Sequence, residues 1–438
     1  MRTALSLLAE FEHRDTTSAA AQPHVVVVGA GFGGLTLATA LASAPVRVTV
    51  VDKRNHHLFQ PLLYQVATAG LSPAQIASPI RSILRHQKNA TVLLAEVTGV
   101  DICAREVLLG PKRIPFDYLV VSTGARHSYF GNNEWEAFAP GLKSLEDATK
   151  IRRHILLAFE RAETETDDDK RDGLLTFIII GGGPTGVEMA GAIAGIAHNV
   201  LREDFRNIDP RSARILLVEA GPRLLPAFPD SLSRYAKKRL EELGVQVHLG
   251  QAVTTCDARG IIMGEKRVSS QTVVWAAGVA ASPAARWLGT LADRAGRVVV
   301  GPNLTLPGDN NIFVIGDTAS VKDKMGKPLP GVAPVAKQQG SFVAKVIRAR
   351  IADKTPPSAF VYSSAGNLAT IGRNAAVVDF GWIKLTGFLA WALWSIVHIF
   401  FLIGFRTRLI VFIDWVWAYL TFQRGARLIT NLPSSTEP

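Results

Sequence analysis

Two apolar runs, each followed directly by a glycine-rich turn, organise the hydrophobic pattern of this chain. Val25–Val28 leads into Gly29-Ala30-Gly31-Phe32-Gly33-Gly34, and Phe177–Ile180 leads into Gly181-Gly182-Gly183-Pro184-Thr185-Gly186. Both segments read as a buried strand, a Gly-x-Gly-x-x-Gly turn and a helix. At such a turn the helix N-terminus binds a pyrophosphate. We therefore predict two dinucleotide sites, formed by Gly29, Gly31 and Gly34 and by Gly181, Gly183 and Gly186.

A carboxylate ends the next apolar run in both halves of the chain. Asp52 follows residues 46–51 and lies 18 residues after the first glycine motif, near the roughly 20 expected for a ribose-binding acid. Glu219 follows residues 215–218, at a spacing of 33 residues, and the polar stretch 202–212 accounts for the excess as an insertion. We predict that both acids bind ribose. The alternative is that each is a solvated strand end.

Three further strands end in small or polar residues. Residues 116–122 lead into Thr123-Gly124, residues 272–277 lead into Gly278, and residues 311–315 lead into Gly316-Asp317. The third strand indicates that the chain returns to its first unit, so the second unit is nested inside the first. The additional candidate cofactor-binding residues are Lys53, Thr123, Gly124, Gly278 and Asp317.

The tail from residue 381 has a different composition, with five of the chain's eight tryptophans. Leu385–Phe405 is a run of 21 residues without a formal charge, and Leu409–Phe422 is apolar apart from Asp414. An apolar run of about 20 residues can span a bilayer, and tryptophan and arginine beside apolar faces also suit a helix lying in the interface. We predict an amphipathic or apolar helical membrane anchor. Spanning and lying flat both stay open, and lying flat is favoured since the second run is short and contains Asp414. A buried helix pair in a dimer interface is the alternative.

The predicted fold class is therefore α/β, with two Rossmann-like dinucleotide-binding domains, one nested in the other, and a helical C-terminal anchor. The expected divisions of the chain are a disordered lead-in at 1–23, the first domain at 24–150 and 291–380, the nested domain at 173–290 and the anchor at 381–438. The acidic stretch Glu163–Asp172 is expected to be a linker.

Charge and cysteine content exclude several classes of function. The net charge of +11 is spread along the chain without aromatic-basic interleaving, which argues against nucleic-acid binding and favours anionic lipid or cofactors. The two cysteines, Cys103 and Cys256, form no C-x-x-C pair. A disulfide framework, a cysteine zinc site and a redox dithiol are thus disfavoured, and no metal site is predicted.

With these segments taken together, the chain resembles the type II (non-proton-pumping) NADH:quinone oxidoreductases, within the two-dinucleotide-domain flavoproteins. The glycine motifs are common to many flavoproteins, whereas residues 59–67 and the tail are more selective. The segments that carry the resemblance are 27–34, 55–67, 181–188, 275–279, 314–317, 338–340 and the Trp/Arg-rich tail.

The resemblance implies FAD, bound non-covalently, on the first motif, and NADH as substrate on the second, with a quinone as electron acceptor. It implies that Asp317 binds the flavin ribityl chain; the alternative is that Asp317 is the N-cap of a helix over Thr318–Val321. It also implies a respiratory enzyme attached peripherally or monotopically to the cytoplasmic face of the inner (cytoplasmic) membrane. A homodimer is compatible with it.

Two candidate catalytic residues come from the same resemblance. Glu188, in the first turn of the second helix, is expected near the nicotinamide and flavin, or else it complements the positive helix end. The family's quinone-site motif Ala-Gln-x-Ala-x-Gln corresponds to Ala333–Gln338, where Pro334 replaces the first glutamine. Gln338 matches the second and is kept as the quinone-side candidate, with a solvated helix position as its alternative.

Other acceptors on the same scaffold are the competing hypotheses. An NADH-dependent ferredoxin or rubredoxin reductase would have no need of the apolar tail. A sulfide:quinone reductase needs cysteines beside the flavin. A membrane-tethered NADH sensor would bind the nucleotide without turnover.

Overall fold

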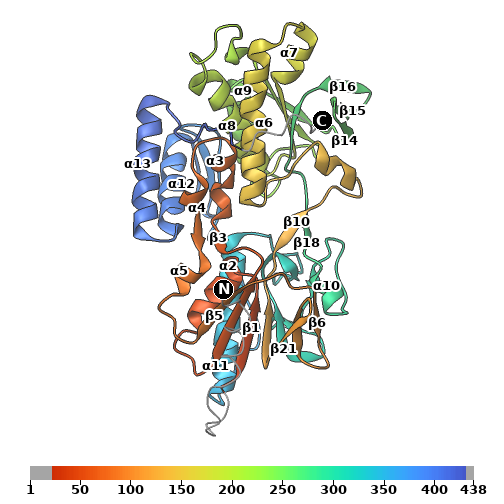
Figure 1. Ribbon diagram of the computed structural model, residues 1–438, viewed down its shortest axis with the longest axis vertical. Helices are drawn as coiled ribbons and strands as arrows, with labels where there is room; N and C mark the ends of the chain where they lie inside the picture. The colour runs from red at the N-terminus through yellow and green to blue at the C-terminus, as the bar shows by residue number, and fades with distance from the viewer. Residues whose placement is uncertain (1–21, 431–438) are drawn as a thin grey trace, which may run out of the picture.

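The computed structural model describes residues 22–430 and arranges them around two parallel sheets, one for each glycine motif (Figure 1). Most of the predicted lead-in lies outside the described residues. The first sheet has the order β20-β21-β9-β1-β2-β5, and only β20 runs antiparallel to its neighbour. Its strands are β20 Thr305–Leu306, β21 Asp309–Val314, β9 Tyr118–Val121, β1 His24–Val28, β2 Arg47–Asp52 and β5 Ala90–Leu94.

Alternate residues of the first sheet enter two different cores, as the two-residue period of a strand requires. Val25 and Val27 pack under helices α2 (Phe32–Ala40), α5 (Ile80–Leu84) and α11 (Ala333–Ile351). Val26 and Val28 face α10 (Ala284–Trp287) and the antiparallel sheet β6–β8 (Gly99–Asp101, Glu106–Leu109, Lys112–Pro115). Because both faces are covered, β1 is a continuous valine run.

The second sheet has the order β13-β12-β11-β17, and all its strands are parallel. Helices α6, α8 and α9 cover one face, while the antiparallel strands β14–β16 cover the other. The strands are β13 Val245–Leu249, β12 Arg214–Glu219, β11 Thr176–Ile180, β17 Thr272–Trp275, β14 Val253–Asp257, β15 Gly260–Met263 and β16 Lys266–Ser269. The helices are α6 Leu145–Thr164, α8 Pro184–Gly195 and α9 Asp230–Glu242.

The chain passes between the two sheets through β10 (Ala125–His127) and returns through β18 (Val279–Ala281). These two strands pair antiparallel and lie between the two bodies in Figure 1. Since β9 precedes and β21 follows this excursion, the α/β fold has the nested order that the sequence predicts. The exact domain boundaries stay a prediction.

The acidic stretch Glu163–Asp172 is not a linker, and that prediction is wrong. It contains the end of α6 and most of α7 (Asp168–Leu174). The carboxylate of Asp167 accepts from the backbone N–H of Lys170 and so caps α7. Glu163 accepts from backbone N–H groups of residues 206–208. Glu163 and Asp167 thus accept hydrogen bonds from otherwise free backbone N–H groups. The clustering of acids in the sequence does not reveal this role.

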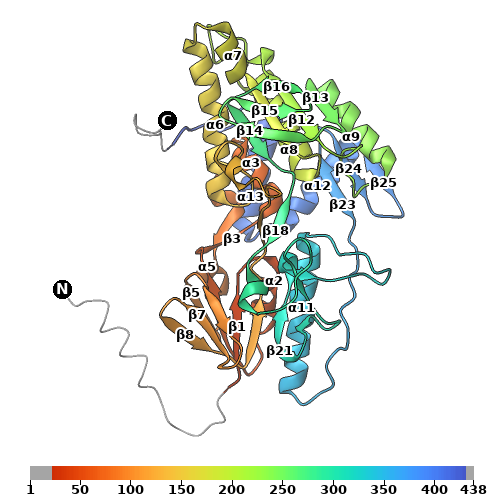
Figure 2. The same ribbon diagram turned by 90° about the vertical axis from the view of Figure 1, so that its right-hand side faces the viewer.

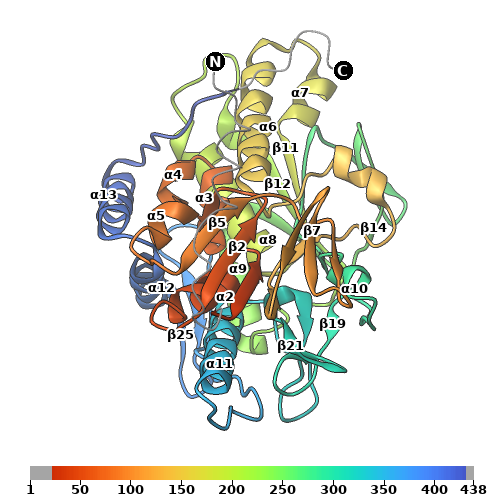
Figure 3. The same cartoon turned by 60° about the horizontal axis from the view of Figure 1, so that its bottom comes forward.

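The tail begins with a small antiparallel sheet and ends in a helical hairpin. Strands β23 (Asn367–Thr370), β24 (Ala376–Asp379) and β25 (Lys384–Thr386) lie beside α9 in Figure 2. Helices α12 (Gly387–Phe401) and α13 (Phe405–Thr421) follow and lie side by side in Figures 1 and 3. The apolar run 385–405 is thus divided between a strand, a helix and a turn. Within residues 22–430 we find no helix with the length and apolar character needed to cross a bilayer.

The hairpin packs on the body through short helices near the start of the chain. Ala390, Trp394 and Val411 are buried in the core shared with α3 and α8. Asp414 accepts a hydrogen bond from Gln75, so the acid that interrupts the apolar run faces the protein. The remaining short elements are β3 His56–Leu58, α3 Leu63–Ala67, α4 Pro73–Ile76, β4 Ala77–Pro79, β19 Val298–Val299 and β22 Ala319–Ser320.

Candidate functional site

The carboxyl ends of four neighbouring parallel strands bring the first set of candidate residues to one sheet edge. Asp317 follows β21, Thr123 follows β9, Gly29 follows β1 and Asp52 ends β2. They lie side by side in this order because their strands are neighbours in the sheet, in the order β21-β9-β1-β2. An extended dinucleotide crosses such an edge with its pyrophosphate at the central glycine turn.

The geometry of the first glycine turn fits a bound phosphate group. Gly29 has φ +96°, and a Cβ on Gly34 would lie 1.9 Å from the Gly29 oxygen, so both positions require glycine. Gly31 is the N-cap residue of α2, and the space a Cβ would occupy there is open. A ligand can therefore approach the backbone at Gly31. Asp52 orders the turn, since its carboxylate accepts from the Ala30 N–H at 2.6 Å and from the Arg54 N–H at 2.8 Å.

A second part of this edge is a cleft of about 90 Å³ beside Asp317. Among the described residues, Asp317 accepts no hydrogen bond. Burial lowers the pKa of Lys143, and the carboxylate of Asp317 opposes this shift by favouring the ammonium form. The helix N-cap alternative for Asp317 is wrong, since residues 319–320 form strand β22. An unpaired carboxylate at a strand end is suited to a sugar hydroxyl, so these residues fit FAD.

The remaining residues predicted for this site differ in their surroundings. The Thr123 hydroxyl is hydrogen-bonded to that of Ser282, and Gly124 has φ +69° and accepts from Thr318 through its carbonyl. Lys53 lies at the surface, 3.9 Å from Glu96. Thr123 and Gly124 are thus part of the sheet edge, whereas the ammonium of Lys53 is largely in solvent.

The second sheet repeats this arrangement at its own carboxyl edge. Glu219 ends β12, Gly181 follows β11 with φ +115°, and Gly278 lies just after β17. The Glu219 carboxylate accepts from the N–H groups of Gly182 at 2.5 Å and Gly221 at 2.6 Å. The space beside Gly183 is open, while a Cβ on Gly186 would meet the Gly181 oxygen and one on Gly278 would meet the ring of Phe130. The two edges therefore have the same chemistry.

Glu188 lies in a cleft of about 160 Å³ between α8, α3 and the tail hairpin. It is the fifth residue of α8. Burial raises the pKa of its carboxyl to about 8, and its one hydrogen-bond donor among the described residues is the Thr370 N–H, at 3.4 Å. At neutral pH this carboxyl can hold or release a proton.

Gln338 does not line the cleft that contains Glu188. Its side-chain amide donates to the Ser363 carbonyl at 2.8 Å and accepts from the Ser363 N–H at 3.0 Å. Both ends of the amide therefore hold the segment that connects α11 to β23. The Lys337 ammonium beside it lies 4.6 Å from the centre of the Phe401 ring on α12.

The sequence reasoning missed Gln339, which is fully buried and accepts the Gly316 N–H at 2.6 Å next to Asp317. Its spacing from the apolar positions 335, 336 and 343 could have placed it on the buried face of α11. The reasoning also missed the polar groups that connect the tail to α3, because pairs about 350 residues apart leave no local pattern.

Comparison with known proteins defines the class first. Residues 23–340 match the family model described as pyridine nucleotide-disulphide oxidoreductase, and residues 365–424 match the one described as the NDH2 C-terminal domain. NDH2 from Plasmodium falciparum, solved in complex with NADH, superposes with a TM-score of 0.86 at 21% identity, covering 94% of this chain and 100% of that one. The sulfide:quinone oxidoreductase of Aquifex aeolicus gives 0.70 at 18% identity, covering 88% and 91%. These structures share the fold.

Two sequence relatives narrow the class to a family. A type II NADH:quinone oxidoreductase of Mycobacterium tuberculosis is 43% identical over 422 residues, which cover 93% of this chain and 90% of that protein. A second such enzyme from the same organism is 42% identical and covers 93% and 89%. The chain belongs to the type II NADH:quinone oxidoreductases.

Proposed function

We propose that this chain oxidises NADH and reduces a quinone through non-covalently bound FAD, without pumping protons, while attached to a membrane. The observation that carries the proposal is the pair of parallel sheet edges, each with an open glycine turn and an acidic strand end, in a chain 43% identical to such an enzyme. FAD, when bound, takes two electrons from NADH and passes them to the quinone.

The first sheet edge is the proposed FAD site. Gly29, Gly31 and Gly34 receive the pyrophosphate at the start of α2, where free N–H groups favour an anion. Asp52 accepts from a ribose hydroxyl through a remaining lone pair, and Asp317 accepts from a ribityl hydroxyl. Thr123 and Gly124 belong to the part of the sheet edge that lies between Asp52 and Asp317. Lys53 is kept as a candidate for the outer, adenosine end.

The second edge is the proposed NADH site. Gly181, Gly183 and Gly186 receive the pyrophosphate, and Gly278 lies at the nicotinamide end, beyond β17. Glu219 accepts from a free 2′-hydroxyl and repels a 2′-phosphate, which favours NADH over NADPH.

Glu188 and Gln338 are the proposed quinone-side residues, in different roles. Glu188 exchanges a proton within the cleft. Gln338 acts by holding the segment around Ser363, because both ends of its amide are engaged there. Pro334 has no N–H and no polar side chain to contribute.

The outer faces of α12 and α13 are the proposed membrane contact. Large apolar side chains with at least two fifths of their surface exposed recur along both helices: Phe388, Leu389, Ile396, Phe400, Phe401, Phe405, Leu409, Phe412, Ile413, Val416, Trp417 and Leu420. On α13 they fall on one stripe at helical spacing, opposite the inward-facing Asp414. A hairpin lying flat on the cytoplasmic face of the inner membrane suits this pattern. The alternative is that a second copy of this chain covers these apolar faces in a homodimer.

Purified full-length protein, assayed with NADH against a quinone series and a soluble dye, tests the function. We expect turnover with both acceptors, and release of free FAD on denaturation. Reduction of the dye without reduction of any quinone would indicate a protein acceptor. Binding of NADH without turnover of either acceptor would indicate a sensor.

A further inference from the structure

Three side chains form a hydrogen-bonded chain from the tail helix α13 into the cleft that contains Glu188. The Trp415 indole N–H donates to Oε1 of Gln65 at 2.8 Å. Nε2 of Gln65 then donates to the Tyr64 hydroxyl oxygen at 3.0 Å. Because Tyr64 and Gln65 belong to α3, this chain joins segments about 350 residues apart in the sequence.

Donor chemistry fixes the direction of both bonds. An indole N–H can only donate, so it orients the amide oxygen of Gln65 toward Trp415 and the NH₂ group toward Tyr64. The Tyr64 oxygen is therefore an acceptor in this bond and keeps its own O–H hydrogen. Burial raises the pKa of Tyr64 well above its usual value, so the hydroxyl stays protonated. Within residues 22–430 the structure gives no acceptor for that hydrogen.

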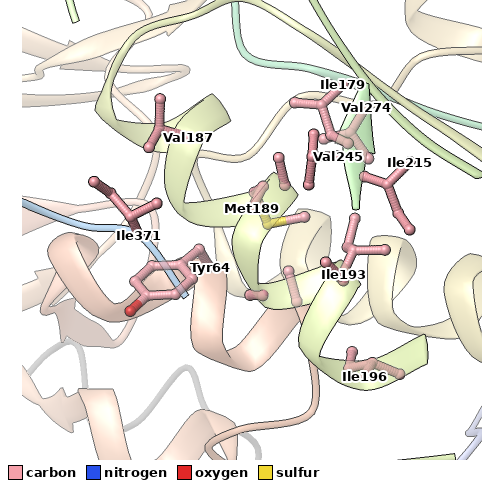
Figure 4. Packing of buried hydrophobic residues seen from close by; sticks show 14 of the residues in the cluster. Tyr64, Ile179, Val187, Met189, Ile193, Ile196, Ile215, Val245, Val274 and Ile371 are labelled. Atoms are coloured by element: carbon pink, nitrogen blue, oxygen red, sulfur yellow. The ribbon is translucent and has the colours of Figure 1, made fainter. Parts of the chain in front are cut away.

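The free O–H of Tyr64 lies in the same cleft as a carboxyl that has few partners. Tyr64 is 6% exposed and packs beside α8 with Val187 and Met189, and in Figure 4 its hydroxyl oxygen points away from these aliphatic side chains. Tyr64 and Glu188 both line the cleft, and the negative charge of Glu188 contributes to the raised pKa of Tyr64. In the part of the chain that the structure describes, the carboxylate of Glu188 accepts one hydrogen bond, from the Thr370 N–H. The Tyr64 O–H is thus a donor that lacks an acceptor, and the Glu188 carboxylate is an acceptor with room for a further donor.

We propose that Tyr64 is a positioning residue for Glu188, whose ionised carboxylate it stabilises by donating its O–H directly or through one water. Gln65 and Trp415 orient this O–H, so the docking of α13 on the body sets how readily Glu188 gives up a proton. The proposal rests on the quinone-side role proposed for Glu188.

The proton balance is simple. Reduction of a quinone to its quinol by NADH consumes the hydride and one further proton. Glu188 releases this proton, its carboxylate accepts the Tyr64 hydrogen bond, and the carboxylate then takes up one proton from bulk solvent. No proton leaves Tyr64 at any point.

The other charged or titratable groups that line the cleft come from three segments: Arg373 between β23 and β24, Tyr419 on α13, and Arg424 beyond it. The Arg373 guanidinium lies 4.4 Å from the Tyr419 ring centre and 3.8 Å from that of Phe422. Arg424 donates to the Thr68 carbonyl at 2.7 Å, and burial lowers its pKa to about 10. Among residues 22–430, Glu188 is the one carboxyl that lines the cleft and no histidine lines it, and burial raises the pKa of Glu188 to about 8.

An infrared pH titration of the FAD-loaded, full-length enzyme in detergent tests the proposal. The spectrum of Glu188→Gln, subtracted from that of the unmutated enzyme, isolates the Glu188 carboxyl band. We expect Tyr64→Phe to raise the midpoint of this band by about one pH unit, a tenfold change in the ionisation constant. Trp415→Phe should shift it in the same direction by a smaller amount. The pH profile of kcat with quinone should move with the midpoint, while the KM for NADH stays constant.

Matched controls remove the same atoms elsewhere in the body: Tyr118→Phe on β9 and Trp287→Phe on α10 should leave the midpoint in place. Gln65→Leu interrupts the chain without altering α13, and retained FAD and dye turnover show that each variant is folded. The proposal is overturned if the midpoint of the Glu188 band is the same in Tyr64→Phe, Gln65→Leu and the unmutated enzyme, even if Glu188→Gln abolishes quinone reduction. A midpoint that shifts while Glu188→Gln still reduces quinone supports the coupling and overturns only the role of Glu188.

Discussion

Replacing Glu188 by glutamine should stabilise the protein by an amount that grows with pH. Burial raises the pKa of this carboxyl from 4.5 to about 8. Below pH 4.5 the carboxyl is protonated in both the folded and unfolded states, so ionisation costs nothing. Between pH 4.5 and 8 the unfolded chain ionises first, and the folded state is destabilised progressively. Above pH 8 the penalty is constant.

The magnitude follows from the size of the shift. One pKa unit corresponds to about 1.4 kcal/mol, so the full shift amounts to about 5 kcal/mol. Because Glu188 lines a cleft open to water, screening reduces this to about 2 kcal/mol. Glutamine is neutral at every pH and still accepts the Thr370 N–H. For a chain of this length, about 2 kcal/mol corresponds to a Tm increase of about 2 °C.

The assay compares the Tm of Glu188→Gln and of the unmutated FAD-loaded enzyme at pH 5 and pH 8, at one scan rate because large proteins often unfold irreversibly. The Tm difference should be small at pH 5 and near its full value at pH 8. Glu265→Gln, in the exposed turn between β15 and β16, is the control and should show the same difference at both pH values. A Glu188→Gln difference that is flat or falls with pH would refute the buried, protonated carboxyl.

Three further predictions concern the two nucleotide sites and the tail. Asp317→Asn should weaken FAD binding about tenfold to a hundredfold, since a hydrogen bond to a charged group contributes about 1.5–3 kcal/mol; bound flavin per protein, measured on dilution, checks this. Glu219→Gln should narrow the preference for NADH over NADPH, and equal kcat/KM for both nucleotides in the unmutated enzyme would contradict the assignment. The combined change Leu409→Ser, Ile413→Ser and Leu420→Ser should release the enzyme from vesicles with FAD and dye turnover intact. In the unmutated enzyme, release by salt alone would instead indicate a mainly electrostatic attachment.

The elements that the sequence predicted well are those whose pattern is local. The strands 25–28 and 177–180, and the glycine turns and helices that follow them, are confirmed within a residue or two. Each has a continuous apolar run or a helical period, bounded by glycine or proline. The acidic ends of β2 and β12 could also be found, because they follow such runs directly.

The errors come from contacts between distant segments. The acidic stretch 163–172 resembles a linker in the sequence because the backbone partners of Glu163, residues 206–208, are remote in the sequence. The run 385–405 reads as one unit in the sequence because hydropathy does not show that residues 384–386 pair with β24. The role of Asp414 within the second apolar run is likewise absent from the sequence pattern, because its partner Gln75 is 339 residues away. In each case a tertiary partner determines what the residue does.

The polar contacts on the inner side of the hairpin determine whether it can be moved to another protein. Asp414 needs Gln75, Trp415 needs Gln65, and the carbonyl of Tyr419 needs Arg373. Detached from this body, the hairpin would bring these groups to lipid or to a foreign surface without partners, at a cost of about 1–3 kcal/mol for each one buried. Residues 387–421 therefore cannot be transferred alone: any transplant must also include α3, α4 and the turn between β23 and β24 that contains Arg373.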